Sequence, residues 1–180
     1  MGCIPATPVS PYILSGPTSN GWASLGSGLI TSALSRYYPL LAGVVTYYKV
    51  FETTNQTAVL RQIEFEEKAA TSGDIKRTPL LIAIFQGSAS VTTPTSGAVY
   101  NPSTTGLIAV ASIAEADYVR TSDTVWTAVA KPNLYIRSGG TSSSDADVKI
   151  VVLSDKSTSV TYAAGAEGRI RLFAEQGTTL

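Results

Sequence analysis

The chain has 180 residues, with 13 Lys or Arg against 13 Asp or Glu and no histidine. The lack of histidine excludes Ser-His-Asp and Cys-His catalysis and histidine-ligated metal sites, and a single cysteine, Cys3, excludes cysteine-rich zinc sites and disulfides within the chain. The zero net charge argues against packaging of nucleic acid, and no apolar run reaches the roughly 18 residues of a membrane span.

The first 48 residues have a composition of their own. They contain one charged side chain, Arg36, and five of the nine prolines. Proline at this density blocks regular helix and central strand, so residues 1–24 are predicted to form an extended N-terminal arm. Its apolar side chains are expected to anchor it on another surface, either this domain or a neighbouring subunit. The predicted anchors are Ile4, Val9, Tyr12, Ile13, Leu14 and Trp22.

One short helix is predicted after the arm. Its apolar residues fall on one helical face, with Ser27 as the cap and Pro39 as the stop. These apolar residues are Leu29, Ile30, Ala33, Leu34 and Tyr37.

From residue 44 the apolar pattern alternates with period two, which indicates β-strands. Residues 47–51 and 59–66 both alternate, and Thr53–Gln56 between them have turn chemistry, so a hairpin is predicted. The continuous apolar run 78–87 suits a strand inside a sandwich. Residues 88–105 are predicted to be a long surface loop with a short strand near Val99–Tyr100.

The remaining elements are also predicted to be strands. The apolar run 106–116 favours a strand over a helix because it contains β-branched residues and Gly106. Further strands are predicted at 118–120, 124–130, 134–137, 148–153, near Tyr162 and at 169–175. Eight to ten strands with frequent turn signals are typical of an all-β antiparallel sandwich or jelly roll. We therefore predict an arm (residues 1–24) followed by one β-sandwich domain (residues 25–180).

Acidic residues are the main candidates for chemistry. Glu64 and Glu66 point to one face of a strand about 7 Å apart, a spacing that glycoside hydrolysis allows. With Glu67 they are better interpreted as a solvated or interfacial charge patch. Asp145 and Asp147 lack the further oxygen ligands that Ca²⁺ requires, so a solvated turn is the better interpretation. No catalytic residue, cofactor or metal is therefore predicted.

The layout as a whole carries a resemblance. The arm MGCIPATPVSPYILSGP is poor in charge and rich in proline, and a Ser/Thr-rich β domain follows it. This combination resembles structural proteins of virions, especially small β-sandwich decoration or cement proteins of tailed bacteriophages. The segment 123–155 looks like the closing strands of such domains. Capsid shell proteins of jelly-roll type commonly carry a basic arm, whereas residues 1–35 contain no Lys or Arg.

The resemblance implies a non-enzymatic structural protein located in the virion. It implies a homo-oligomer, with a trimer as the expected form, that binds the major capsid protein or other virion proteins and neither nucleic acid nor membrane. The first alternative is a carbohydrate- or receptor-binding fibre or tail module, because the chain has nine tyrosines and two tryptophans. The second alternative is a jelly-roll shell protein.

Overall fold

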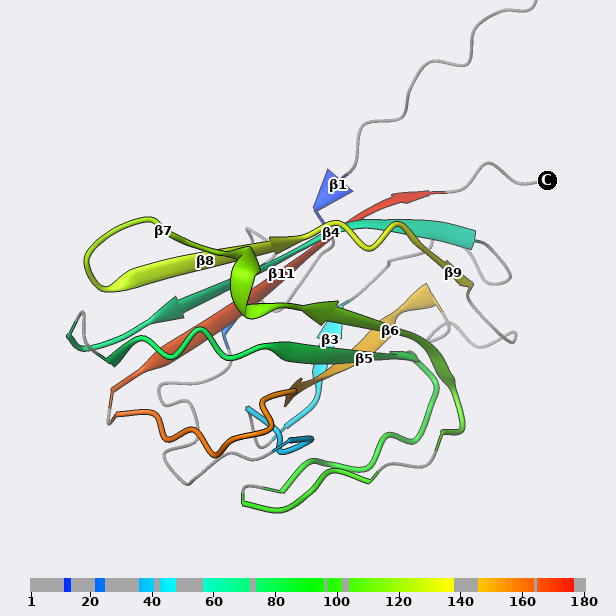
Figure 1. The fold of residues 1–180 in the computed structure, drawn as a ribbon. Coiled ribbons are helices and arrows are strands. Elements are labelled where there is room, and N and C mark those ends of the chain that lie inside the picture. The colour runs from blue at the N-terminus through cyan, green and yellow to red at the C-terminus, as the bar shows by residue number, and fades with distance from the viewer. Residues whose placement is uncertain are drawn as a thin grey trace, which may run out of the picture.

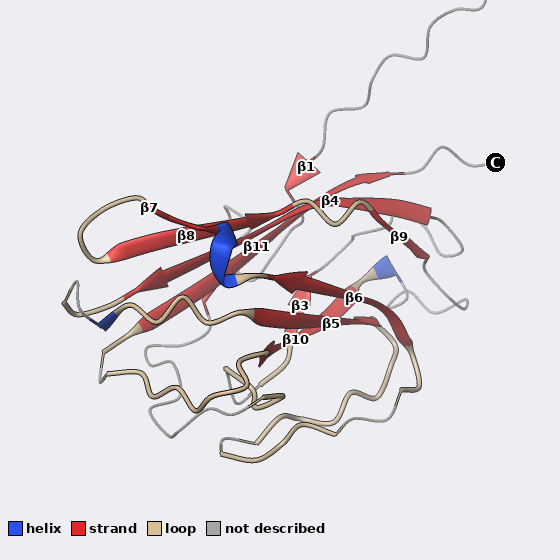
Figure 2. Cartoon of the chain, in the orientation of Figure 1, coloured by secondary structure: helices blue, strands red, loops and turns tan. Residues whose placement is uncertain are grey.

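The chain forms two antiparallel β-sheets that pack face to face in a computed structural model (Figure 1). The structure describes residues 12–13, 22–24, 36–40, 43–47, 57–71, 74–95, 97–101, 104–137, 146–163 and 165–176. The strands are β1 (Tyr12–Ile13), β2 (Ala23–Ser24), β3 (Val45–Tyr47), β4 (Thr57–Lys68), β5 (Leu80–Gln86), β6 (Leu107–Ile113), β7 (Tyr118–Arg120), β8 (Val125–Ala130), β9 (Leu134–Arg137), β10 (Val148–Ser154) and β11 (Glu167–Gln176). A short 3₁₀-helix, Glu115–Asp117, joins β6 to β7 (Figure 2). The predicted all-β sandwich is confirmed.

Most connections cross from one sheet to the other. The larger sheet has the order β1-β11-β4-β8-β7, with β2 also paired to β11 and β9 also paired to β4. The smaller sheet has the order β3-β10-β5-β6. Among the described strands, only β5 with β6 and β7 with β8 are consecutive strands that pair with each other. The two sheets are therefore held together by segments that lie far apart in the sequence.

The predicted hairpin of residues 44–66 is wrong. β3 pairs with β10 in the smaller sheet, whereas β4 pairs with β11, β8 and β9 in the larger one. The two strands lie in different sheets, and β3 faces β11, where the buried hydroxyl of Tyr47 donates a 2.9 Å hydrogen bond to the carbonyl of Ile170. Alternation carries no information about the partner strand.

The core lies between the sheets and is built from the inward-facing positions of the long strands. On β5 the inward positions alternate with outward ones, because successive side chains of a strand point to opposite faces. On β4 the inward parity changes from Ala58 and Leu60 to Ile63 and Phe65, where the pairing with β11 shifts register. The fully buried members on these strands are Ala58, Leu60, Ile63, Phe65, Leu80, Ile82 and Ile84. Burial of each large apolar side chain contributes about 1.5–3 kcal/mol.

A second apolar cluster covers the outer face of the smaller sheet. It contains Ala83 and Phe85 of β5 and Val151 and Leu153 of β10. The segment between β5 and β6 folds back over these residues and adds Ala89 and Tyr100. Figure 1 shows this segment, in green, beneath the smaller sheet. The continuous apolar runs of β5 and β10 therefore reflect burial on both faces.

Tyr100 fixes this covering segment. Its hydroxyl donates to the carbonyl of Thr92 at 2.9 Å, and its backbone N–H donates to the carbonyl of Tyr37. The strand predicted at Val99–Tyr100 is wrong, because these bonds close the loop on itself and on Tyr37 and do not extend a sheet. Gly106, with φ +79°, closes the segment, and a Cβ there would lie 2.5 Å from the Cβ of Ala89. Only glycine fits this close approach.

The predicted short helix lies mostly outside the described residues, which resume at Arg36. From there the backbone forms a turn, and Tyr37 has φ 65°, which is incompatible with a right-handed helix. Pro39 then bridges to Leu153. Tyr162 lies in a loop and not in the strand predicted near it.

Candidate functional site

The outer face of the larger sheet carries alternating charges on β4 and β11. Rows of paired residues cross it: Glu167 with Lys68, Arg169 with Glu66, and Arg171 with Glu64. Each row forms an ion pair, at 3.1 Å for Lys68 with Glu167 and 2.8 Å for Arg169 with Glu66. We call these six residues the charged face.

The end of the charged face formed by Glu64 and Arg171 is partly shielded from solvent. The guanidinium of Arg171 donates two hydrogen bonds to Oε2 of Glu64, and Gln62 donates to Oε1 of the same carboxylate at 2.6 Å. The side chains of Arg171 and Glu64 are 22% and 14% exposed, against 51% and 50% for Lys68 and Glu167. The predicted charge patch at Glu64 and Glu66 is thus present, with each carboxylate bound by an arginine.

Trp22 of the predicted arm lies on this face. It precedes β2, which pairs antiparallel with Arg169 and Ile170 of β11. The indole ring lies 4.5 Å from the guanidinium carbon of Arg169 and 4.4 Å from that of Arg171. Cation–π contacts of this kind contribute about 0.5–2 kcal/mol, depending on desolvation. One predicted anchor is therefore held on the chain's own domain.

The other predicted anchors are described only in part. Tyr12 and Ile13 form β1, which pairs with Ala174 and Phe173 of β11, while their side chains lie outside the described residues. Ile4, Val9 and Leu14 lie outside them entirely. Because β4 occupies the other edge of β11, β1 and β2 both lie along the same edge. Backbone pairing thus joins two points of the arm to one strand.

A shallow depression of about 380 Å³ opens beside Arg169, the partner of Trp22. Its lining residues are Glu66, Lys68, Val125, Glu167, Gly168 and Arg169. Both charges of each pair are present, so the depression offers donors and acceptors without a net charge. Such a surface suits a neutral polar ligand or a polar protein surface better than an ion.

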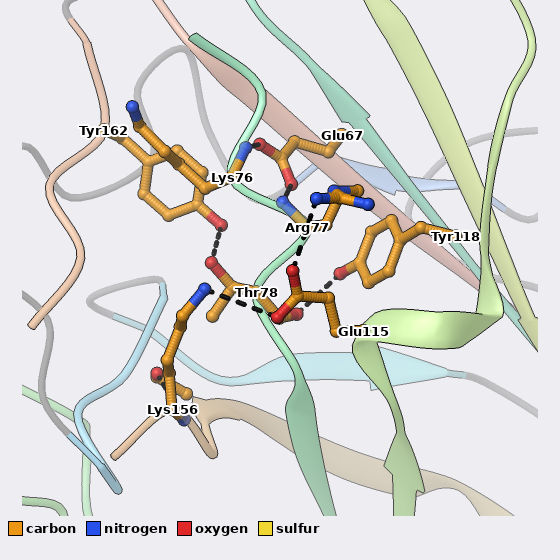
Figure 3. Close-up of polar contacts among 9 residues, drawn as sticks. Glu67, Lys76, Arg77, Thr78, Glu115, Tyr118, Lys156 and Tyr162 are labelled. Atoms are coloured by element: carbon orange, nitrogen blue, oxygen red, sulfur yellow. Dashed lines mark hydrogen bonds and ion pairs between the residues drawn. The ribbon is translucent and has the colours of Figure 1, made fainter. Parts of the chain in front are cut away.

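A second polar cluster surrounds the segment that enters β5 (Figure 3). Glu67 of β4 is completely buried, and its two oxygens accept the backbone N–H groups of Lys76 at 2.6 Å and Arg77 at 2.9 Å. Arg77 has φ 47°, a conformation that non-glycine residues seldom adopt. The carboxylate thus holds a strained turn in place. Burial raises the pKa of Glu67, opposed by the hydrogen bonds from Lys76 and Arg77.

Thr78 is the next residue along and is also completely buried. Its carbonyl accepts a hydrogen bond from the hydroxyl of Tyr118, and its side-chain oxygen accepts one from Tyr162, both at 2.7 Å. Burial raises the pKa of both tyrosines, so both stay neutral donors at neutral pH. The turn is therefore clamped from β4, from β7 and from the loop that precedes β11.

Glu115 closes the cluster at the surface. It lies 3.4 Å from the guanidinium of Arg77 and 3.5 Å from the ammonium group of Lys156, and Figure 3 shows it between the two. Arg77 also stacks over Trp126 at 5.3 Å. Both acids of the cluster, Glu67 and Glu115, are thus engaged by groups of the chain itself, and these contacts hold the turn before β5.

Sequence reasoning missed the burial of Glu67. It grouped this residue with Glu64 and Glu66, although Glu67 has the inward parity of Ile63 and Phe65 on β4. A carboxylate at an inward position needs buried donors, and here these are backbone N–H groups of a loop. Asp145 lies outside the described residues, and among those described no group of three His, Cys, Asp or Glu residues is placed to hold a metal.

Comparison with family models and with curated protein sequences finds no match to this chain. Among the described residues, no helix is long and apolar enough to cross a membrane. The arrangement of the chain's own residues therefore carries the functional argument.

Proposed function

We propose that this chain is a structural protein of a virion that oligomerises and decorates or cements the capsid. The observation that carries the proposal is the pairing of the arm with a sheet edge, at β1 and β2 on β11. Addition of an extended segment to an exposed strand is a general mode of recognition, because backbone hydrogen bonds supply the affinity. The resemblance in layout supports the virion as the location.

The register of the two contacts separates the arm into a root and a tip. Along β11 the contacts are three residues apart, at Ile170 and Phe173, whereas in the arm Ile13 and Ala23 are ten residues apart. The root, residues 12–24, is thus joined at both of its ends to the edge of its own domain. The tip, residues 1–11, is the part that we propose reaches a neighbouring subunit.

Light scattering of the full chain at low micromolar concentration tests the oligomer. A trimer, three times the chain mass of 18.8 kDa, is the expected form. A variant with residues 1–11 replaced by an equally long Gly-Ser segment should be monomeric, because the root still covers β11. An unchanged mass in that variant would contradict the role of the tip. A large closed particle would favour the shell-protein alternative.

Antibodies raised against the recombinant chain test the location. Immuno-electron microscopy of intact virus particles from the source of the sequence should show label on the particle surface. Label confined to disrupted particles or absent from both would contradict a decorating role.

A second candidate function rests on Trp22 and the depression beside it. An aromatic ring next to paired charges is an arrangement that can stack on a sugar ring and hydrogen-bond its hydroxyls. In this reading the chain is a carbohydrate- or receptor-binding module. Binding on a glycan array should be lost in Trp22→Ala and kept in Trp126→Ala, since Trp22 contacts Arg169 of the depression lining, whereas Trp126 contacts Arg77, which lies outside it. Absence of glycan binding by the full chain would eliminate this candidate.

A further inference from the structure

A groove of about 540 Å³ lies at the edge of the sandwich where β6 approaches β8 and β9. Its lining mixes polar and apolar groups, and two of its valines are open to solvent: Val110 is 50% exposed and Val129 is 39% exposed. The lining residues are Val110, Ala111, Ser112, Asp117, Val129, Ala130, Lys131, Pro132 and Leu134.

One wall of the groove is a strand with a free edge. β6 pairs with β5 on one side, and no described strand pairs with it on the other. Alternate residues of its seven, Leu107–Ile113, therefore direct N–H and C=O groups outward. A strand of this length offers an edge of roughly 23 Å.

The opposite wall is fixed in position. Between β8 and β9 the chain turns through Asn133, which has φ 47° and donates to the carbonyl of Lys131. Arg61 of β4 holds the same side chain through a 3.2 Å bond to its oxygen, and Arg61 is itself paired with Glu175 at 2.6 Å. The groove is thus preformed, which lowers the entropic cost of binding a segment in it.

We propose that this groove binds the arm tip, residues 1–11, of a second copy of the chain, which adds as a strand to the free edge of β6. The inference rests on the proposed function and names the surface that receives the arm. The tip has no charged side chain, so it would bring no unpaired charge to a groove whose lining holds one acid, Asp117, and one base, Lys131. Extended, its eleven residues span about 36 Å, more than the edge requires.

The proline spacing of the tip sets how it would pair. A strand directs every second N–H toward its partner. If the even-numbered residues face β6, then Gly2, Ile4 and Ala6 supply three consecutive donors before Pro8 ends the pairing. Pro5 then points away from β6 and prevents a further strand from adding. In this phase each β6 edge therefore accepts one tip and no further strand.

The position of the root favours a second copy over the chain's own tip. β1 lies on one edge of β11, while β9, beside the groove, pairs with β4 on the far side of β11. The chain's own tip would have to cross the ends of both long strands, whereas a neighbour's tip approaches the groove from solvent.

Cys3 makes the proposal testable, because it is the only cysteine. Val110 and Ser112 share one face of β6, because they lie opposite Ala83 and Leu81 of β5. A cysteine on β6 that lies directly opposite Cys3 would be within the roughly 4.5–5.5 Å typical of Cβ atoms in cross-strand pairs, so these two positions are the ones to test. A Val110→Cys variant of the full chain, oxidised mildly, should form disulfide-linked multimers on a non-reducing gel. Val119→Cys is the matched control, since Val119 is also an exposed edge-strand valine, 65% exposed on β7. It should give no more cross-linking than the unsubstituted chain.

Two further variants test whether the cross-link depends on the tip lying along β6. Ser112→Cys should also cross-link, and Ile4→Asp added to Val110→Cys should reduce the multimers at least tenfold. Light scattering on the same samples separates the two proposals. An oligomer in which neither introduced cysteine cross-links to a second chain overturns the groove and leaves the proposed function standing. A monomer overturns both, and a disulfide within one chain overturns the second copy as occupant.

Discussion

The two outer faces of this sandwich are built on opposite principles. The smaller sheet hides its outer face under the segment between β5 and β6, which packs Ala89 and Tyr100 onto Phe85 and its neighbours. The larger sheet leaves its outer face open and fills it with ion pairs and one tryptophan. The difference is visible in the strands themselves: β5 is apolar almost throughout, whereas β11 alternates charged and apolar residues over 169–172. A covered face serves stability, and an open, paired face remains available for recognition.

Truncation of a phenylalanine on each face should show the largest contrast. Phe85 is 1% exposed in the second apolar cluster, while Phe173 on β11 is half-buried beneath Arg171. We expect Phe85→Ala to lower the free energy of unfolding by about 3–5 kcal/mol, because it leaves a cavity. Phe173→Ala should cost about 1 kcal/mol, in lost contact with Arg171. Urea denaturation measures both, and equal losses would contradict the division between the faces.

Substitution of the buried carboxylate of Glu67, behind the charged face, should have the next largest effect on stability. Glu67→Gln places an amide NH₂ against one of two backbone donors, so we expect a loss of about 1–3 kcal/mol. Glu64→Gln, which keeps an oxygen toward Arg171, should cost less. A larger loss of stability in Glu64→Gln would contradict the inference that Glu67 is the carboxylate that holds the turn.

The buried Glu67 also makes the stability of the protein depend on pH. Burial raises the pKa of Glu67 above its ordinary value of 4.5, so the native state binds this proton more tightly than the unfolded chain. The stability from this group is therefore complete below pH 4.5 and declines as the pH rises through the raised pKa. The advantage of the wild-type chain over Glu67→Gln should shrink over that interval in denaturation curves. An advantage that grows with pH would contradict the direction of the shift.

Removal of Trp22 should have a smaller effect on the open face. Trp22→Ala removes a ring from two guanidinium groups, for which we expect about 1 kcal/mol. Hydrogen exchange at β11 should report a faster opening of the β2 contact. Tyr135→Ala is the control, because Tyr135 is 80% exposed and should change neither quantity.

The smallest effect belongs to the most exposed ion pair of the charged face. A double-mutant cycle on Lys68 and Glu167 should give a coupling of less than about 1 kcal/mol, and roughly 1 M NaCl should remove most of it. A coupling of several kcal/mol would mean that this end of the charged face is not solvated.

The sequence predicted the positions of strands better than their partners. Alternation and turn chemistry placed the long strands to within a few residues, because the period of two is set by the backbone itself. The hairpin at residues 44–66 is wrong because β3 and β4 find their partners far along the chain, in β10 and β11. The charge patch at Glu64 and Glu66 was predicted, but its arginines lie on β11, where only pairing brings them near. Glu67 accepts hydrogen bonds from the backbone of a loop, and no local sequence pattern predicts that contact.

The position of β11 in the sheet order has a consequence for synthesis. This strand follows all of its partners along the chain, yet it lies inside the larger sheet, between β4 and the arm segments β1 and β2. While the ribosome is still making residues 167–176, β4 lacks its longest partner and the root of the arm has no edge to join. The closing of the sandwich and the seating of the arm must therefore wait until these residues have emerged, so that an arm is positioned only on domains that are already complete.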